Sequence, residues 1–210
     1  MPPRPRIVIA DDHLLMAQAL EHLLARDFDV IATVGDGRAL VQAAHDLHPD
    51  LVVVDIGMPL LNGLEAGERL KAQHPEIKII YLTQNRDPRL AAEALHRDAS
   101  GYLLKDAAAS ELIAAIRAAL DGRSYVSPAI AGELADESPA GDSRSRTLSA
   151  REREVLQLLA EGKSMKEVAA VLDISPRTVE FHKYRLMNRL GVKTNAELVQ
   201  YAVRTGIIRA

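Results

Sequence analysis

The chain has 210 residues, of which 48% are apolar and 26% are charged, so it holds enough apolar material for one large or two small packed domains. This composition excludes a mainly disordered protein, and no apolar run approaches the roughly 18 residues of a membrane span. With no cysteine the chain has neither a disulfide framework nor a thiolate metal site, which is typical of the reducing cytoplasm, where we expect it to act.

The formal net charge of −3 is divided unevenly along the chain. Residues 1–143 hold 13 basic and 22 acidic side chains, a net charge of −9, whereas residues 144–210 hold 13 basic and 7 acidic ones, a net charge of +6. Such an asymmetry favours two modules with different partners. The segment 132–147 reads GELADESPAGDSRSRT, which is a linker composition. We therefore expect domains over 1–122 and 148–210, joined by a linker over 123–147.

Alternating strand-like and helix-like segments make up the first domain. Short, mostly apolar runs predict buried strands at 7–10, 30–34, 51–54, 77–82 and 101–104. Helix-length segments follow them at 14–25, 37–47, 63–74, 88–98 and 108–121. Five such repeats predict an α/β fold, a doubly wound five-stranded parallel sheet of the flavodoxin-like order 2-1-3-4-5.

Five polar side chains stand at the carboxyl ends of these strands, on the edge where such sheets bind ligands: Asp11, Asp12, Asp55, Thr83 and Lys105. Each alone is an ordinary cap, turn or surface residue, but their coincidence on one edge favours a site. Converging carboxylates repel one another unless a cation compensates them, which Lys105 and a Mg²⁺ ion would do. A carboxylate nucleophile, a metal, a hydroxyl and an ammonium group together suit phosphoryl transfer.

The segments IVIADDH, VVVDIGMP, YLT and GYLLKD resemble the receiver domain of two-component response regulators, over residues 6–121. The resemblance implies that Asp55 is the phospho-acceptor and takes a phosphoryl group from a phosphohistidine of a partner histidine kinase. It also implies that Mg²⁺ is held by Asp11, Asp12, Asp55 and the backbone carbonyl of Gly57.

The same resemblance assigns roles at the ends of the fourth and fifth strands. Thr83 would hydrogen-bond the phosphoryl group and Lys105 would pair with it. Tyr102, three positions before the lysine, resembles the aromatic switch residue. An ordinary strand aromatic is the alternative for Tyr102, because aromatic residues favour strands.

Four short helices are predicted in the second domain, at 150–161, 165–172, 176–190 and 195–205. Three begin with a capping-box pair, which are Ser149/Glu152, Ser164/Glu167 and Thr194/Glu197. The fourth begins with Ser175 and Pro176, and glycines at 162 and 191 mark helix ends. The short turn between the second and third helices indicates a helix-turn-helix.

The longer helix of this pair has two unlike faces. Val179, Leu186 and Leu190 share one side, whereas the opposite side carries Phe181 and Tyr184 among polar residues. A solvated surface helix is the ordinary explanation of such a pattern. The concentration of positive charge and the outward aromatics instead favour a helix that enters a DNA groove.

Residues 148–202, from LSAREREVL to ELVQYA, resemble the LuxR-type DNA-binding domain. With the receiver and the Lys105-Asp106 pair, the chain is identified as a member of the NarL/FixJ family of response regulators. The family implies a DNA-contacting set made of Ser175, Arg177, Thr178, Glu180, Phe181, His182, Lys183, Tyr184 and Arg185. It also implies that the last helix contributes to dimerisation on DNA.

Together the resemblances imply a DNA-binding transcriptional regulator in which phosphorylation of Asp55 shifts the receiver conformation and promotes dimerisation and promoter binding. The implied partners are a cognate histidine kinase, promoter DNA and a second copy of the chain; RNA polymerase is a further candidate, and no membrane is involved. The chain would not be an enzyme, beyond catalysing its own phosphorylation and dephosphorylation.

Two alternatives stay open. One is a DNA-binding regulator that works without phosphorylation, its acidic group serving only structure. The other is a Mg²⁺-dependent phosphatase with an aspartyl nucleophile, whose Asp-x-Asp signature is missing because Asp55 is followed by Ile56 and Gly57.

Overall fold

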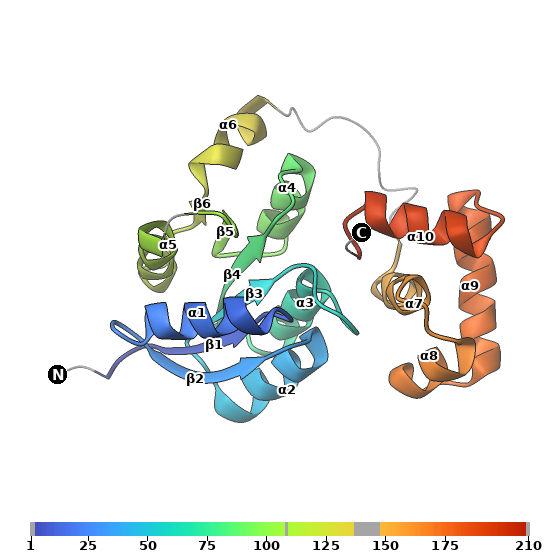
Figure 1. Ribbon diagram of the computed structural model, residues 1–210, viewed down its shortest axis with the longest axis horizontal. Coiled ribbons are helices and arrows are strands. Elements are labelled where there is room, and N and C mark those ends of the chain that lie inside the picture. The colour runs from blue at the N-terminus through green and yellow to red at the C-terminus, as the bar shows by residue number, and fades with distance from the viewer. Residues whose placement is uncertain (1–2, 108, 137–147, 209–210) are drawn as a thin grey trace. The chain divides into compact units, whose positions relative to one another are not determined.

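The computed structural model describes residues 3–107, 109–136 and 148–208 (Figure 1). The chain forms two compact units, an N-terminal one built on a parallel sheet and a C-terminal one made of helices. Within the described residues, no helix is both long and apolar enough to cross a membrane.

The sheet of the N-terminal unit has the predicted order with one strand added. Its members are β1 (Arg6–Ala10), β2 (Asp29–Val34), β3 (Leu51–Asp55), β4 (Lys78–Thr83), β5 (Gly101–Leu104) and β6 (Tyr125–Val126). They pair in parallel in the order β2-β1-β3-β4-β5-β6, which confirms the five predicted strands and their predicted order in the sheet. The sixth strand lies in the segment expected to be linker, where two residues are too few to produce a periodic pattern.

Among the described residues, six helices accompany this sheet: α1 (Leu14–Leu24), α2 (Gly37–Leu47), α3 (Gly63–Gln73), α4 (Pro88–His96), α5 (Ala109–Leu120) and α6 (Pro128–Asp136). The first five agree with the predicted ranges to within two residues. Asp36, Asn62 and Asp87 cap α2, α3 and α4 by accepting hydrogen bonds from first-turn amides. The sequence analysis contains no prediction for α6, and residues 137–147 of the expected linker lie outside the described residues.

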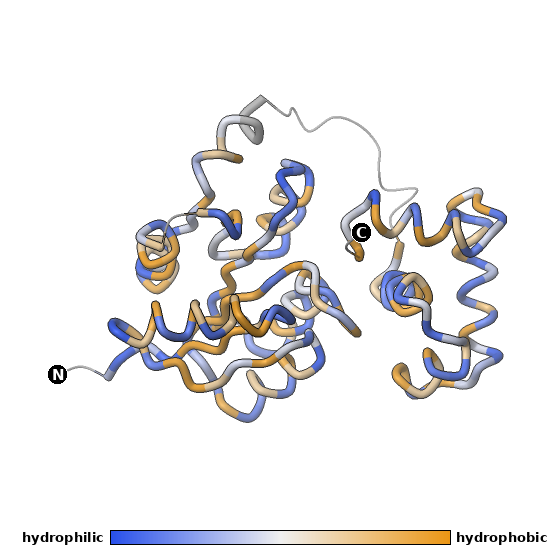
Figure 2. Tube along the Cα trace, in the orientation of Figure 1, coloured by the Kyte–Doolittle hydropathy of each residue, from blue (hydrophilic) through white to orange (hydrophobic). Residues whose placement is uncertain are grey.

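The apolar core explains which sheet face each helix covers. Leu20 and Leu24 of α1 and Leu112 and Ile116 of α5 share one cluster with alternate residues of the central strands, such as Ile9. The strands run orange through the middle of this unit in Figure 2, because they are apolar on both faces. The intervening strand residues face the other helices, and α2 and α3 pack side by side there.

The C-terminal unit contains the four predicted helices, α7 (Ala150–Ala160), α8 (Met165–Leu172), α9 (Pro176–Leu190) and α10 (Asn195–Arg204). All three predicted capping boxes are formed in both directions, by Ser149/Glu152, Ser164/Glu167 and Thr194/Glu197. Ser175 caps α9, and Gly191 ends it in the left-handed conformation at φ 70°. The buried residues Val155, Val168, Val179, Leu186 and Leu198 join the four helices in one core.

Candidate functional site: an acidic cluster and a groove-reading helix

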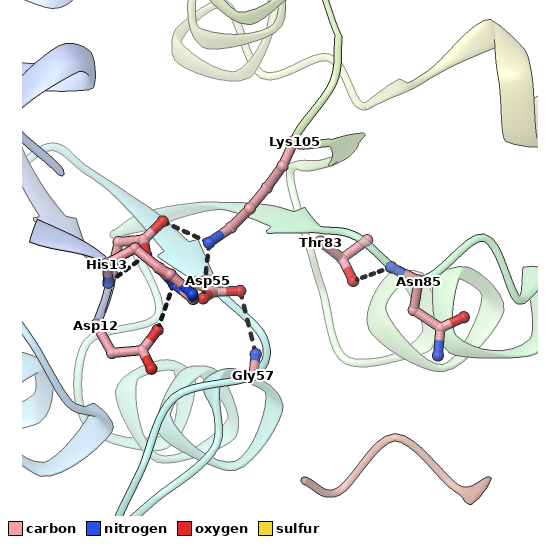
Figure 3. A network of polar contacts seen from close by, with 8 residues as sticks. Asp12, His13, Asp55, Gly57, Thr83, Asn85 and Lys105 are labelled. Atoms are coloured by element: carbon pink, nitrogen blue, oxygen red, sulfur yellow. Dashed lines mark hydrogen bonds and ion pairs between the residues drawn. The ribbon is translucent and has the colours of Figure 1, made fainter. Parts of the chain in front are cut away.

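The carboxyl edge of the sheet brings Asp11, Asp55 and Lys105 into direct contact. Figure 3 shows the Lys105 side chain directed toward Asp55. Asp11 follows β1 and Asp55 ends β3, and these strands are neighbours, so their carboxylates converge. Lys105 Nζ donates to Asp11 Oδ2 at 2.6 Å and to Asp55 Oδ2 at 2.8 Å. All three side chains are at most 4% exposed. One buried ammonium therefore compensates two buried carboxylates, as the sequence analysis expected.

Asp12 and His13 complete this acidic cluster on its more exposed side. The His13 Nδ1 atom lies 2.9 Å from Asp12 Oδ1 and 3.2 Å from Asp11 Oδ1. One ligand atom each of Asp11, Asp12, His13 and Asp55 lie within 4.8 Å of one another. The sequence analysis gave His13 no role; its position directly after two strand-end aspartates is the signal that could have found it.

This donor set fits the magnesium ion that receiver domains take. Three carboxylates supply the hard oxygen ligands that Mg²⁺ prefers, and their shared negative charge exceeds what one lysine compensates. Gly57 lies beside the cluster, where its amide donates to Asp55 Oδ1 at 3.2 Å. The metal-binding role of its carbonyl stays a prediction.

Thr83 and Tyr102 stand on the neighbouring strands β4 and β5, and both are buried. Thr83 Oγ1 accepts a hydrogen bond from the Asn85 amide at 3.0 Å. Burial raises the pKa of the Tyr102 phenol, and the nearby Thr83 side chain works against this shift. The Tyr102 ring is fully buried, so it occupies an inward position in this structure.

The predicted DNA-contacting residues lie on α9 and its N-cap Ser175, and those exposed on the helix are Arg177, Glu180, Phe181, Tyr184 and Arg185. Val179 and Leu186 are fully buried, whereas Phe181 and Tyr184 are 58% and 68% exposed. The two-faced pattern read from the sequence is therefore confirmed. At the start of α9, Ser175 accepts from the Thr178 amide at 3.1 Å, and their hydroxyls are 2.8 Å apart.

Arg185, Phe181 and His182 of the proposed contact set also make contacts within the unit. Arg185 stacks over the Phe181 ring at 5.6 Å, and its guanidinium lies 3.8 Å from the buried Glu152 of α7. His182 is half-buried, and its Nδ1 atom is covered and unpartnered within the described residues. Arg177, Glu180 and Tyr184 are exposed.

The N-terminal unit is a doubly wound sheet with an acidic carboxyl edge, and the C-terminal unit is a helix-turn-helix with an exposed aromatic face. This combination is typical of a DNA-binding regulator that receives a signal. Sequence comparison agrees: residues 7–117 match the response regulator receiver domain and residues 146–202 match the bacterial regulatory proteins of the luxR family. The chain belongs to the NarL/FixJ family of response regulators and is a two-component transcription regulator.

Individual relatives support this assignment over nearly the whole chain. The oxygen regulatory protein NreC of Staphylococcus aureus is 35% identical over 97% of this chain and 99% of its own length. RcsB of Salmonella typhimurium has a similar structure with a TM-score of 0.60, 28% identity and coverage of 96% of this chain and 98% of its own. ChrA, the response regulator of a heme-sensing two-component system, has a TM-score of 0.53, 32% identity and coverage of 98% and 99%.

Proposed function

We propose that Asp55 is the phospho-acceptor of this regulator. The observation that carries the proposal is the contact of Lys105 Nζ with both Asp55 and Asp11 at the carboxyl edge of β1 and β3. In the transfer, a carboxylate oxygen of Asp55 attacks phosphorus, the P–N bond of the donor phosphohistidine breaks and its imidazole leaves. The partner is a histidine kinase, because a phosphoramidate supplies this phosphoryl group at the required energy.

Each neighbour of Asp55 has a part in this transfer. The Lys105 ammonium pairs with charge that develops on the phosphoryl oxygens, and the Thr83 hydroxyl hydrogen-bonds one of them. Asp11, Asp12, Asp55 and the Gly57 carbonyl would hold Mg²⁺, which supplies further charge neutralisation when it is bound. The chemistry is confined to the chain's own aspartate, so the protein is a switch and not a turnover enzyme for external substrates.

Phosphorylation is then read out on DNA. The added charge and acceptor oxygens draw Thr83 and Lys105 toward the phosphoryl group and further stabilise the inward position of Tyr102. This shift favours dimerisation and promoter binding through the outer side of α9, where two copies bind two half-sites more tightly than one. A solved complex of RcsB contains two dimers of that relative bound to two parallel DNAs, which supports DNA binding by a dimer here.

The test is a mobility shift on genomic fragments with and without acetyl phosphate, comparing wild type and Asp55→Ala. We expect acetyl phosphate to increase DNA binding by the wild type and to leave Asp55→Ala unchanged. Equal stimulation of both proteins would refute the assignment of Asp55. Strong binding by both in the absence of acetyl phosphate would instead support a regulator that works without phosphorylation.

A further inference from the structure

Three histidines gather on the N-terminal unit, away from the acidic cluster. His45 lies in the last turn of α2, His48 caps the end of that helix and His74 caps the end of α3. Their ring centroids are 6.4 Å apart for His45 and His48, and 5.7 Å apart for each of the two pairs with His74. The residues come from two helices that pack side by side, so the fold and not the sequence alone assembles this histidine cluster.

These spacings are close to those of imidazoles around one metal ion. Three histidines bound tetrahedrally to zinc at about 2.0–2.1 Å have ring centroids about 5 Å apart. Within the described residues, only the acidic cluster has its ligand atoms already converged, so the histidine rings must turn to bind. His45 and His48 are exposed, so their rings can turn. The ring centroids need to approach one another by about 1 Å to reach the spacing of zinc-bound imidazoles.

The two ring nitrogens of His74 have unlike surroundings. Its Nδ1 atom lies 3.7 Å from the Glu76 carboxylate, and its Nε2 atom is buried without a hydrogen-bond partner within the described residues. Ligating histidines typically direct one ring nitrogen to a carboxylate and the other to the metal. The His74 side chain is only 14% exposed, so water does not readily satisfy the second nitrogen.

The backbone around the cluster also favours a cation. Both α2 and α3 end here, and the carboxyl end of a helix carries partial negative charge. His48 adopts the left-handed conformation at φ 47°, where glycine is the usual residue. An imidazole therefore stands at a position where glycine would be less strained.

We propose that His45, His48 and His74 form a zinc site that joins the ends of α2 and α3, with Glu76 as a positioning residue for His74 and water in the fourth position. Imidazole nitrogens suit zinc and other transition metals and disfavour magnesium, whereas the oxygen-rich acidic cluster suits magnesium. The two sites are therefore chemically distinct, and the zinc site lies outside the proposed phosphoryl chemistry.

The experiment titrates zinc into the full chain, freed of any histidine tag, by calorimetry in saturating Mg²⁺, which occupies the acidic cluster. We expect the wild type to bind one zinc ion. His74→Gln and the double variant His45→Gln/His48→Gln should each weaken binding at least about tenfold. His22→Gln and His96→Gln change exposed histidines on α1 and α4 and serve as matched controls that should keep wild-type affinity.

Further variants make the result decisive. Glu76→Gln should weaken zinc binding about tenfold without changing the stoichiometry, because it removes the carboxylate behind His74. Unaltered zinc affinity in the double variant, which changes only exposed side chains and should fold normally, would overturn the proposal. So would loss of zinc binding in His13→Gln alone, because the ion would then belong to the acidic cluster. Neither result depends on Asp55, so the proposed function is tested separately.

Discussion

At the scale of single residues, the buried Lys105 decides whether the acidic cluster is tolerated. Its Nζ atom contacts the carboxylates of both Asp11 and Asp55 at hydrogen-bonding distance. Two carboxylates removed from water repel each other and lose solvation, and removing the one cation between them leaves both costs in place. The residue that is proposed to assist phosphoryl transfer is therefore also a structural one.

Lys105→Ala should lower the free energy of unfolding at neutral pH by about 3 kcal/mol, because it leaves buried carboxylates uncompensated. Added Mg²⁺ should restore more stability to this variant than to wild type, since the ion takes over the compensation. Urea unfolding with and without Mg²⁺ measures both effects, with Lys105→Arg as the charge-preserving control. Equal stability of Lys105→Ala and wild type in the absence of metal would contradict this role.

Several properties of single residues follow from sequence position, and others do not. The convergence of Asp11, Asp55 and Lys105 could be predicted because each follows a strand of a parallel sheet, and the sheet order places those strands together. The sequence places His13 beside the two strand-end aspartates, but the contact of its Nδ1 atom with their carboxylates depends on a side-chain rotamer, which no sequence pattern specifies. The engagement of Arg185 by Phe181 was likewise not foreseen, although the two residues are four apart on one helix.

At the scale of elements, predictions succeeded wherever a repeated pattern or a cap marks an element. The three capping boxes fix the starts of α7, α8 and α10, and the continuous apolar runs locate the five long strands. The short strand β6 and helix α6 were missed because two residues carry no periodicity and the surrounding composition is that of a linker. The histidine cluster was missed because His74 comes from a different helix from His45 and His48.

Helix α3 approaches the sheet through Gly67, where a Cβ atom would lie 1.8 Å from the Tyr81 hydroxyl. Gly67→Ala should therefore lower the free energy of unfolding by about 1–3 kcal/mol, even though alanine is the better helix former. Gly132→Ala is the matched control, because this α6 glycine has no atom within 4 Å of the added Cβ; it should be neutral or stabilising. Thermal unfolding of both variants measures the difference, and equal melting temperatures would exclude the close approach.

Glu152 links two helices of the C-terminal unit. Burial raises the pKa of the Glu152 carboxyl, but hydrogen bonds from Ser149 and the guanidinium of Arg189, 2.8 Å away, lower it by more, so the net shift is downward. A carboxyl whose folded pKa lies below its unfolded value contributes stability above the unfolded pKa, about 4.3, and loses it as the pH falls through the folded pKa. The link between α7 and α9 is therefore expected to be present at neutral pH and to weaken in acid.

Glu152→Gln keeps the capping-box geometry and removes the charge, so it isolates the ion pair. It should cost about 1–2 kcal/mol at pH 7, and the difference from wild type should shrink as the pH falls below about 4. Urea unfolding across this pH range, with hydrogen exchange of α7 and α9, measures the effect. Glu167→Gln alters an exposed capping box and should lose less; a difference from wild type that is constant with pH would argue against the ion pair.

At the scale of the whole molecule, the net charge of −3 describes neither functional half. The N-terminal 143 residues carry the excess of acidic side chains, among them the carboxylates proposed to hold Mg²⁺ and to accept the phosphoryl group. The last 67 residues carry a net charge of +6. A polyanion attracts the second part, and counterions released from DNA supply much of that binding. DNA affinity should consequently fall steeply with salt, despite an overall isoelectric point near 6.2.

Lys183 provides the sharpest test of this division, because its position on α9 is expected to meet phosphate and not a base edge. Lys183→Ala should weaken binding of the phosphorylated protein about equally on all DNA sequences. Because a dimer then loses two phosphate contacts, the negative slope of log affinity against log salt concentration should become shallower by about 2. Fluorescence anisotropy over a salt series measures this slope. Arg26→Ala removes an exposed cation from the N-terminal unit and should leave the slope unchanged. A selective loss of affinity for one DNA sequence would instead assign Lys183 to base recognition, since phosphate contacts carry no direct sequence information.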